Sequence, residues 1–168
     1  MIYKTFDPDL LRPGNFFLVK RRTLIGRLIS FGQKIRYGNS SKWNHCGVII
    51  NANGDLIEAH ADGVKQRNIR VYDAWEHDVR IVNVLCSDED RQEIVNFARS
   101  CLGDTYGFLT ILSIGLILVT GFRLRFNIRG QEICSGLVAR SMERGPFIFH
   151  EEPAQISPAY LASFFQVT

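Results

Sequence analysis

The feature that most constrains the fold is a tight turn in the first third of the chain. Residues 51–55, with the sequence NANGD, lie between an apolar run that starts near His45 and a returning run at 56–60. Asn-Gly and Gly-Asp pairs favour the tight turns that join neighbouring antiparallel strands. The pattern therefore predicts a β-hairpin, and counting back from the turn brings His45 and Glu58 toward the same end of it.

The other strands and helices are predicted from periodicity and turn residues. Strand-like runs lie at 16–20, 64–70 and 79–85, and runs of helical spacing lie at 23–35, 88–102, 134–144 and 158–165. The clearest helix starts after Ser87, where Asp90 completes a capping box, and Gly103 ends it. Since no repeat or linker divides the 168 residues, we expect one domain, residues 1–168, of the α+β class with an antiparallel meander in its first half.

The composition limits the classes of partner and compartment. A formal net charge of +3 is too weakly basic to indicate nucleic-acid binding. Residues 1–10 lack the apolar segment of a secretory signal, so a cytoplasmic location is expected. The four cysteines form no Cys-x-x-Cys pair and lack zinc-ligand spacing, so we expect free thiols and neither a metal nor a cofactor.

An uncharged segment at 105–122 has two interpretations. Its apolar part, 108–119, approaches the length that spans a bilayer, but glycines interrupt the segment at 107, 115 and 121. A helix buried within the domain is therefore favoured. The alternative is peripheral membrane association through residues 108–120, which the basic residues after the segment would assist.

The candidate chemistry centres on Cys134, which begins a run of helical spacing. A cysteine at a helix N-terminus lies at the positive end of the peptide dipoles, which favours the thiolate, and Ser135 and Gly136 leave room around the sulfur. His45 and Glu58 would place an imidazole beside a carboxylate, which orients the ring and stabilises its protonated form. These residue types suit nucleophilic catalysis by a thiolate–imidazolium pair.

Four short motifs also occur in an informative order. They are the turn Leu11–Phe16, the histidine strand Asn44–Ile49, the strand Leu56–Ala59 and the cysteine motif Ile133–Val138. In this order they resemble the papain-like cysteine peptidases and amidases of the NlpC type, in the circularly permuted branch shared with relatives of lecithin–retinol acyltransferase. The resemblance spans about residues 11–144 and implies an antiparallel sheet or small barrel packed against helices, with the nucleophile helix C-terminal to the sheet.

The same resemblance implies roles for individual residues. It makes Cys134 the nucleophile, His45 the general base and Glu58 the acid that orients the histidine. It also matches Tyr106 to a tyrosine that lines the site of permuted members. The chain departs from the family pattern at three positions, where Asp, Val and Asp are usual: Asn15, Cys46 and Gly107.

Several neighbouring residues are weighed as secondary members of the site. The residues expected to line it are Tyr106, Trp43, Ser135 and His60. His60 follows Glu58 by two positions and shares its strand face, so it is a rival for orienting His45. A zinc site built from His45, Cys46 and Cys134 is disfavoured, because adjacent strand residues point to opposite faces.

These observations lead to three functional hypotheses. The first is a cysteine hydrolase that cleaves an amide bond, in a peptide or peptide-like substrate, through a Cys-His-Glu triad and a thioester acyl-enzyme. The second is a lipid acyltransferase or thiol esterase that uses the same triad, with an acyl-lipid substrate. The third is a catalytically silent binding module of the same fold. The oligomeric state is left open.

Overall fold

A five-stranded antiparallel sheet forms the frame of the protein. The computed structural model describes residues 7–22, 27, 30, 31, 33, 34, 37–60, 62–72, 77–106 and 131–167. The strands are β1 (Phe16–Lys20), β2 (His45–Ile49), β3 (Asp55–His60), β4 (Gly63–Asn68) and β5 (Asp78–Val82). Their order across the sheet is β4-β3-β2-β1-β5, so the first four form a meander and β5 returns to pair with β1. The predicted α+β class and antiparallel meander are confirmed.

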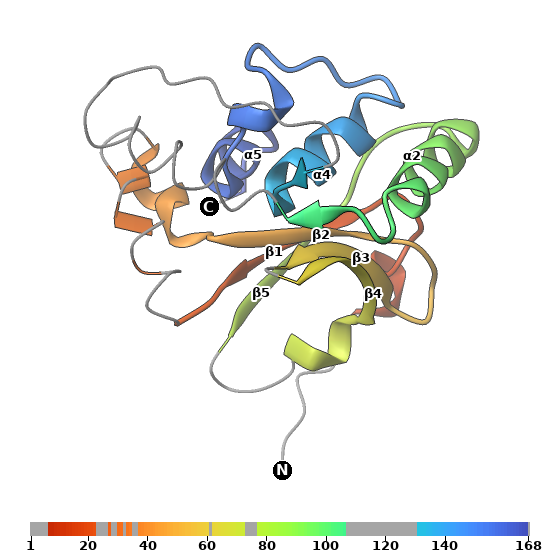
Figure 1. Cartoon of the computed structure of the whole chain (residues 1–168), viewed down its shortest axis with the longest axis horizontal. Helices are drawn as coiled ribbons and strands as arrows, with labels where there is room; N and C mark the ends of the chain where they lie inside the picture. The colour runs from red at the N-terminus through yellow and green to blue at the C-terminus, as the bar shows by residue number, and fades with distance from the viewer. Residues whose placement is uncertain are drawn as a thin grey trace.

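Three α-helices of the described residues lie on one side of this sheet (Figure 1). They are α2 (Asp88–Ser100), α4 (Cys134–Met142) and α5 (Pro158–Phe164). A short parallel pair, β6 (Thr105–Tyr106) with β7 (Gln131–Glu132), leads into α4. The 3-10 helices are η1 (Pro8–Leu10), η2 (Gly38–Lys42), η3 (Ile69–Tyr72) and η4 (Pro153–Gln155). The capping box of Ser87 and Asp90 is present at the start of α2, as predicted.

Two sequence predictions fall largely outside the described residues. Within the helix predicted at 23–35, residues 27, 30, 31, 33 and 34 are described, and all are helical. The uncharged segment at 105–122 lies outside the described residues after Tyr106, and so does the expected membrane contact at 108–120. Among the helices of the described part of the chain, none combines the length and apolar character needed to cross a bilayer.

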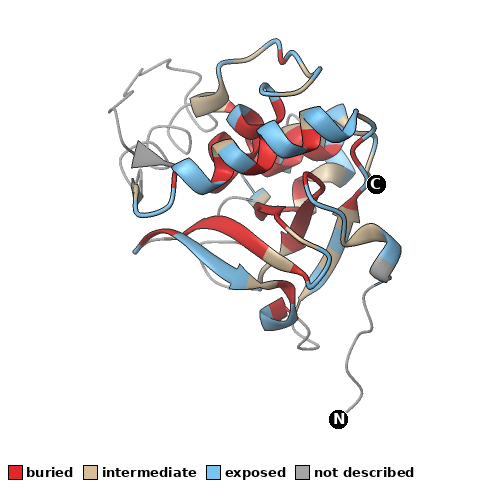
Figure 2. Ribbon diagram, turned by 90° about the vertical axis from the view of Figure 1, so that its right-hand side faces the viewer, coloured by how far each residue is buried: buried red, intermediate tan, exposed pale blue. Residues whose placement is uncertain are grey.

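The side chains of the sheet alternate between two apolar cores. Phe16 and Leu18 of β1 pack with Cys46 and Val48 of β2 in the larger core, which also contains the buried faces of α2, α4 and α5. On the opposite face, residues from β1, β2, β3 and η3 form a second core: Phe17, Val19, Ile49, Leu56, Ile69 and Tyr72. Figure 2 shows the buried layer between the helices and the sheet. Both faces of the central strands are therefore covered.

Two strands are shorter than the sequence predicted, and their neighbours explain why. The run predicted at 64–70 leaves the sheet after Asn68, because Ile69 and Tyr72 turn in η3 to join the second core. The run predicted at 79–85 ends at Val82. Beyond it, the N–H of Val84 donates to Oδ1 of Asn15 at 3.0 Å rather than to a strand partner.

Gly47 determines how closely β2 can approach its neighbours. It pairs with Phe17 of β1. On the other side, Val48 pairs with Ile57 and Ile49 with Leu56, and this register, when continued, places Glu58 opposite Gly47 and His60 opposite His45. A Cβ atom at this position would lie 2.7 Å from the carbonyl oxygen of Ile57 and 2.8 Å from Cβ of Glu58. The glycine therefore leaves the space beside which the Glu58 side chain lies.

Replacing Gly47 with alanine should disrupt this part of the sheet. We expect Gly47→Ala to lower the free energy of unfolding by about 3 kcal/mol, because the added methyl group overlaps backbone that cannot move independently. Urea denaturation would measure the change. Gly145→Ala is the matched control, since its added Cβ would meet Ile94 at 3.3 Å and nothing closer, and its effect should stay within about 1 kcal/mol. Equal stability of the two variants would contradict this explanation of Gly47.

Candidate active site

A buried carboxylate, Glu58, lies at the centre of the candidate site. Glu58 is on β3 and has 0% exposure, and its Oε2 lies 2.6 Å from Nε2 of His45, the first residue of β2. Burial of an ionised carboxylate is costly unless it accepts hydrogen bonds. Burial alone would raise the pKa of Glu58, but hydrogen bonds from His45, His60 and Tyr72 outweigh it and hold the pKa far below its usual value. The carboxylate is therefore charged and fixes the orientation of the His45 ring.

Tyr72 and Arg21 extend the hydrogen bonds around the Glu58 carboxylate. The hydroxyl of Tyr72, on η3, donates to Oε2 of Glu58 at 2.5 Å and accepts from Nη2 of Arg21 at 2.5 Å. The Arg21 guanidinium also lies over the Tyr72 ring, 5.3 Å from its centre. Burial and the Glu58 charge raise the pKa of Tyr72, so its hydroxyl keeps its proton and acts as a donor.

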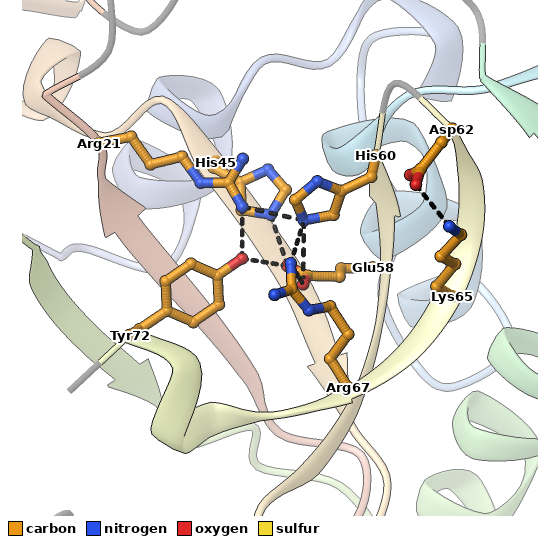
Figure 3. Close-up of polar contacts among 8 residues, drawn as sticks. All are labelled: Arg21, His45, Glu58, His60, Asp62, Lys65, Arg67 and Tyr72. Atoms are coloured by element: carbon orange, nitrogen blue, oxygen red, sulfur yellow. Dashed lines mark hydrogen bonds and ion pairs between the residues drawn. The ribbon is translucent and has the colours of Figure 1, made fainter. Parts of the chain in front are cut away.

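His60 contacts the other oxygen of the same carboxylate. Its Nε2 lies 3.0 Å from Oε1 of Glu58, 2.9 Å from Nη2 of Arg21 and 3.3 Å from Nη1 of Arg67. Figure 3 shows these side chains converging on Glu58 from separate strands and loops. The geometry favours Glu58 over His60 as the residue that orients His45. Glu58 hydrogen-bonds His45, whereas His60 contacts Glu58 from its other side.

Cys134 approaches the same histidine from the helix side of the sheet. It is the first residue of α4, where the N–H groups of the first turn have no acceptor within the helix. A hydrogen bond with the Cys46 side chain lowers the pKa of Cys134 well below the ordinary 9.0, and the hydrogen bond and positive charge of His45 lower it further, against the effect of burial. These causes favour a thiolate at Cys134 at neutral pH.

The pKa of His45 shifts upward, in the direction opposite to that of Cys134. Burial would lower the pKa of His45, but its hydrogen bonds with Cys134 and Glu58 leave the pKa above the ordinary 6.5. Because Nε2 faces Glu58 at 2.6 Å, Nδ1 is the ring nitrogen available to the thiol. A lowered thiol pKa and a raised imidazole pKa both favour the charged forms of the two groups. The structure therefore brings Cys134, His45 and Glu58 together, with the carboxylate orienting the histidine.

The expected site-lining residues have different surroundings. Ser135 is buried and its hydroxyl donates to the carbonyl of Ile156 at 2.6 Å, which makes it a packing residue rather than a free polar group. Trp43 is 4% exposed and belongs to the same core as Cys134. Tyr106 pairs through its backbone with Glu132, two residues before Cys134, so β6 runs beside the start of α4.

The sequence argument that opposite strand faces separate His45 from Cys46, and so disfavour a zinc site with Cys134, needs a correction. His45 contacts side chains of the second core and Cys46 lies in the first, as adjacent strand residues should. Beyond the effect of burial, Cys134 nevertheless raises the pKa of both His45 and Cys46, and His45 is the first residue of its strand. Opposite strand faces therefore do not keep the two side chains apart.

Another group of ligand-type side chains lies within the candidate site itself. Among the described residues, His45, Glu58 and His60 have ligand atoms within 4.8 Å of one another. Two guanidinium groups oppose a cation there, since Arg21 and Arg67 lie 2.9 and 3.3 Å from Nε2 of His60. The positive charges of the two guanidinium groups stabilise the Glu58 carboxylate and disfavour the binding of a metal ion beside it.

No protein-family model matches the sequence, and no curated protein sequence matches it either. The supporting residues that sequence reasoning missed are Tyr72, Arg21, Arg67 and Cys46. In the sequence, Arg21 is one of three consecutive basic residues at 20–22, and Cys46 was considered only as a departure from the family pattern and as a disfavoured zinc ligand. Tyr72 carried no local signal, because its contact with Glu58 depends on how η3 folds back over the sheet.

The pKa directions predict how Cys134 reacts with an alkylating reagent. Its rate of modification by iodoacetamide should reach half its maximum well below pH 9.0, since the thiolate forms there. In Glu58→Gln the His45 cation loses its carboxylate, so the pKa of His45 falls, that of Cys134 rises, and the midpoint moves up by roughly one to two pH units. Rates would be measured by mass spectrometry of the Cys134 peptide.

Asp55→Asn is the matched control for this experiment. Asp55 is on the same strand as Glu58, but its hydrogen-bond partners are Asn51 and Asn68 rather than His45. Its removal should leave the alkylation midpoint unchanged. An equal shift in both variants, or the same midpoint in Glu58→Gln as in the wild type, would refute the assigned link between the carboxylate and the thiol.

Tyr72→Phe should lower stability through the loss of one hydroxyl. The change removes a donor to the buried Glu58 carboxylate and an acceptor for Arg21, so we expect the free energy of unfolding at pH 7 to fall by about 2 kcal/mol. Tyr160→Phe makes the same chemical change where the hydroxyl only accepts from the His150 N–H at 3.3 Å, and should cost less than about 0.5 kcal/mol. Urea denaturation of both variants would show whether the hydroxyl supports Glu58 as argued.

Proposed function

We propose that this protein is a cysteine hydrolase that cleaves an amide bond in a peptide or peptide-like substrate. The observation that carries the proposal is the position of Cys134. It begins a helix and hydrogen-bonds His45, whose Nε2 lies 2.6 Å from the buried carboxylate of Glu58. A polarised thiol, a base and an orienting acid are the parts that nucleophilic acyl transfer requires.

The reaction would proceed in two steps. The Cys134 thiolate attacks the amide carbonyl, and the resulting oxyanion lies near the N–H groups at the start of α4, which can donate to it. The His45 imidazolium then gives its proton to the leaving amine as the C–N bond breaks and the thioester remains. Neutral His45 next removes a proton from water, which attacks the thioester and returns the Cys134 thiolate.

The resemblance to permuted papain-like enzymes of the NlpC type supports the same proposal. The nucleophile helix lies C-terminal to the sheet in the chain, as the permuted order requires. The Asn15 departure is compatible with that pattern, because Oδ1 of Asn15 accepts from Val84 N–H and from Arg91, both at 3.0 Å. An aspartate would offer the same acceptor. Gly47, two residues after His45, leaves the space that Glu58 uses.

The two other hypotheses make different demands on the chain. A lipid acyltransferase would use the same thioester, with the acyl chain against residues 108–120, which lie outside the described residues. A silent binding module would have no need for a thiol with a lowered pKa beside a histidine with a raised one. The hydrolase is therefore the function proposed.

Replacing the nucleophile tests the mechanism directly. A panel of fluorogenic peptidyl amides and one activated ester would be offered to the wild type, to Cys134→Ala and to Cys101→Ala. We expect turnover by the wild type and by Cys101→Ala, and a loss of at least about a thousand-fold in Cys134→Ala. Intact mass spectrometry during turnover should detect an acyl group on Cys134.

Each alternative outcome identifies a different function. An acyl group on Cys134 that passes to a lipid acceptor, with no amide cleavage, would favour the acyltransferase. Absence of acylation by every probe, together with slow alkylation of Cys134 at neutral pH, would favour the binding module. Full activity in Cys134→Ala would exclude the thiol mechanism.

A further inference from the structure

Two guanidinium groups crowd one ring nitrogen beside the candidate site. Nε2 of His60 lies 2.9 Å from Nη2 of Arg21 and 3.3 Å from Nη1 of Arg67, and it also lies 3.0 Å from Oε1 of Glu58. A ring nitrogen carries either a hydrogen or a lone pair, so it cannot accept from an arginine and donate to the carboxylate at the same time. At least one of these three contacts is therefore not a hydrogen bond, and donors exceed acceptors around Nε2 of His60.

The charges of this cluster are also unequal. Arg21 and Arg67 contribute two positive charges, whereas among the described residues Glu58 is the one carboxylate paired with either guanidinium, at 3.7 Å from Arg67. Lys65, two residues before Arg67 on β4, is paired with Asp62 at 2.5 Å. Within the part of the chain that the structure describes, one guanidinium charge thus has no balancing carboxylate, and such an excess attracts an anionic ligand.

Solvent can reach this excess charge without reaching Glu58. The side chain of Arg67 is 40% exposed and that of His60 is 20% exposed, whereas the side chain of Glu58 has 0% exposure. The His60 ring lies beside the ring of His45, with 5.2 Å between their centres (Figure 3). A peptide backbone spans about 3.5 Å per residue. A residue of a substrate bound at His45 can therefore bring its side chain to Arg67 and His60.

We infer that Arg67, together with Arg21 and His60, forms a subsite for a carboxylate of the substrate, carried by the residue beside the scissile amide. The inference rests on the proposed amide hydrolysis and narrows its substrates to acidic peptides or peptide-like amides. A carboxylate fits the fork of a guanidinium through two parallel hydrogen bonds. It also supplies the missing acceptors, so that His60 can donate to Glu58 while the arginines donate to the ligand.

Arg67 rather than Arg21 should determine the selectivity. Arg21 donates to the hydroxyl of Tyr72 and lies over its ring, so its guanidinium belongs to the support of Glu58. Arg67 lies 3.7 Å from Oε1 of Glu58, beyond hydrogen-bond range, and its side chain is exposed. Replacing Arg67 therefore leaves the hydrogen bonds of Glu58 with His45 and Tyr72 in place.

The test compares two uncharged-ended peptides that differ by one carboxylate, acetyl-Ala-Glu-Ala amide and acetyl-Ala-Gln-Ala amide. Mass spectrometry would follow cleavage on either side of the central residue. For the wild type we expect kcat/KM to be higher for the Glu peptide by about tenfold or more, because Gln loses the charge-assisted contact. In Arg67→Gln this preference should fall to about twofold or less, while kcat/KM for the Gln peptide stays within about threefold of the wild-type value.

Arg70→Gln is the matched control for the loss of charge. Arg70 is an exposed arginine of η3, three residues after Arg67, and its replacement should leave the preference unchanged. Calorimetry would measure binding separately in Cys134→Ala, which keeps the subsite but lacks the proposed nucleophile. There the Glu peptide should bind about tenfold more tightly than the Gln peptide, and adding Arg67→Gln should remove the difference.

Failure of the subsite and failure of the hydrolase give different results. Equal kcat/KM for both peptides in the wild type, an undiminished preference in Arg67→Gln, or an equal loss of preference in Arg70→Gln would overturn the subsite and leave the hydrolase intact. Absence of cleavage, together with the expected preference in binding to Cys134→Ala, would refute the hydrolase and support the subsite. Absence of both cleavage and preference would refute both. Binding of inorganic phosphate to Cys134→Ala, with no preference between the peptides, would also overturn the carboxylate subsite.

Discussion

The buried charge of Glu58 is the constraint on which the rest of this site depends. A carboxylate with 0% exposure is costly unless hydrogen bonds or positive charges compensate its burial, and here these partners come from separate parts of the fold. His45 comes from β2, His60 from β3 itself, Tyr72 from η3 and Arg67 from β4. Arg21, just after β1, holds the Tyr72 hydroxyl. The end of the sheet is thus fixed by the same contacts that orient His45.

The position of Cys134 follows from how α4 packs on the sheet rather than from its place in the chain. The pairing of β6 with β7 places Glu132 beside Tyr106, and the helix with Cys134 begins two residues later. Because α4 packs against the helix-facing side of the sheet, its first residue meets the end of β2, where His45 lies. A cysteine near the C-terminal end of the chain can therefore join a histidine and a carboxylate from an early hairpin.

Local patterns in the sequence predicted the main strands and helices of the fold. They did not predict the side chains that hold Glu58 in place. The turn at 51–55 and the capping box of Ser87 are short-range features, so the hairpin and α2 could be predicted from residues near them. The competition between Glu58 and His60 could not be decided by counting, because continuing the strand register places His60 opposite His45 and Glu58 opposite Gly47. The missing side chain of Gly47 lets Glu58 reach His45. Tyr72 and Arg21 belong to other elements, and their contacts exist only after the sheet has formed.

The energetic character of the cluster supports a chemical role. Buried ionised groups seldom stabilise a fold more than apolar residues of similar volume would, because desolvation opposes their mutual attraction. Here Glu58, His45 and Cys134 are all buried, and each has a pKa moved in the direction that favours its charged form. The Cys46 thiol moves the other way and remains a donor to Cys134. Packing alone would be served by aliphatic side chains at these positions, whereas the proposed role of Cys134 as a nucleophile would use the charges and donors that lower its pKa.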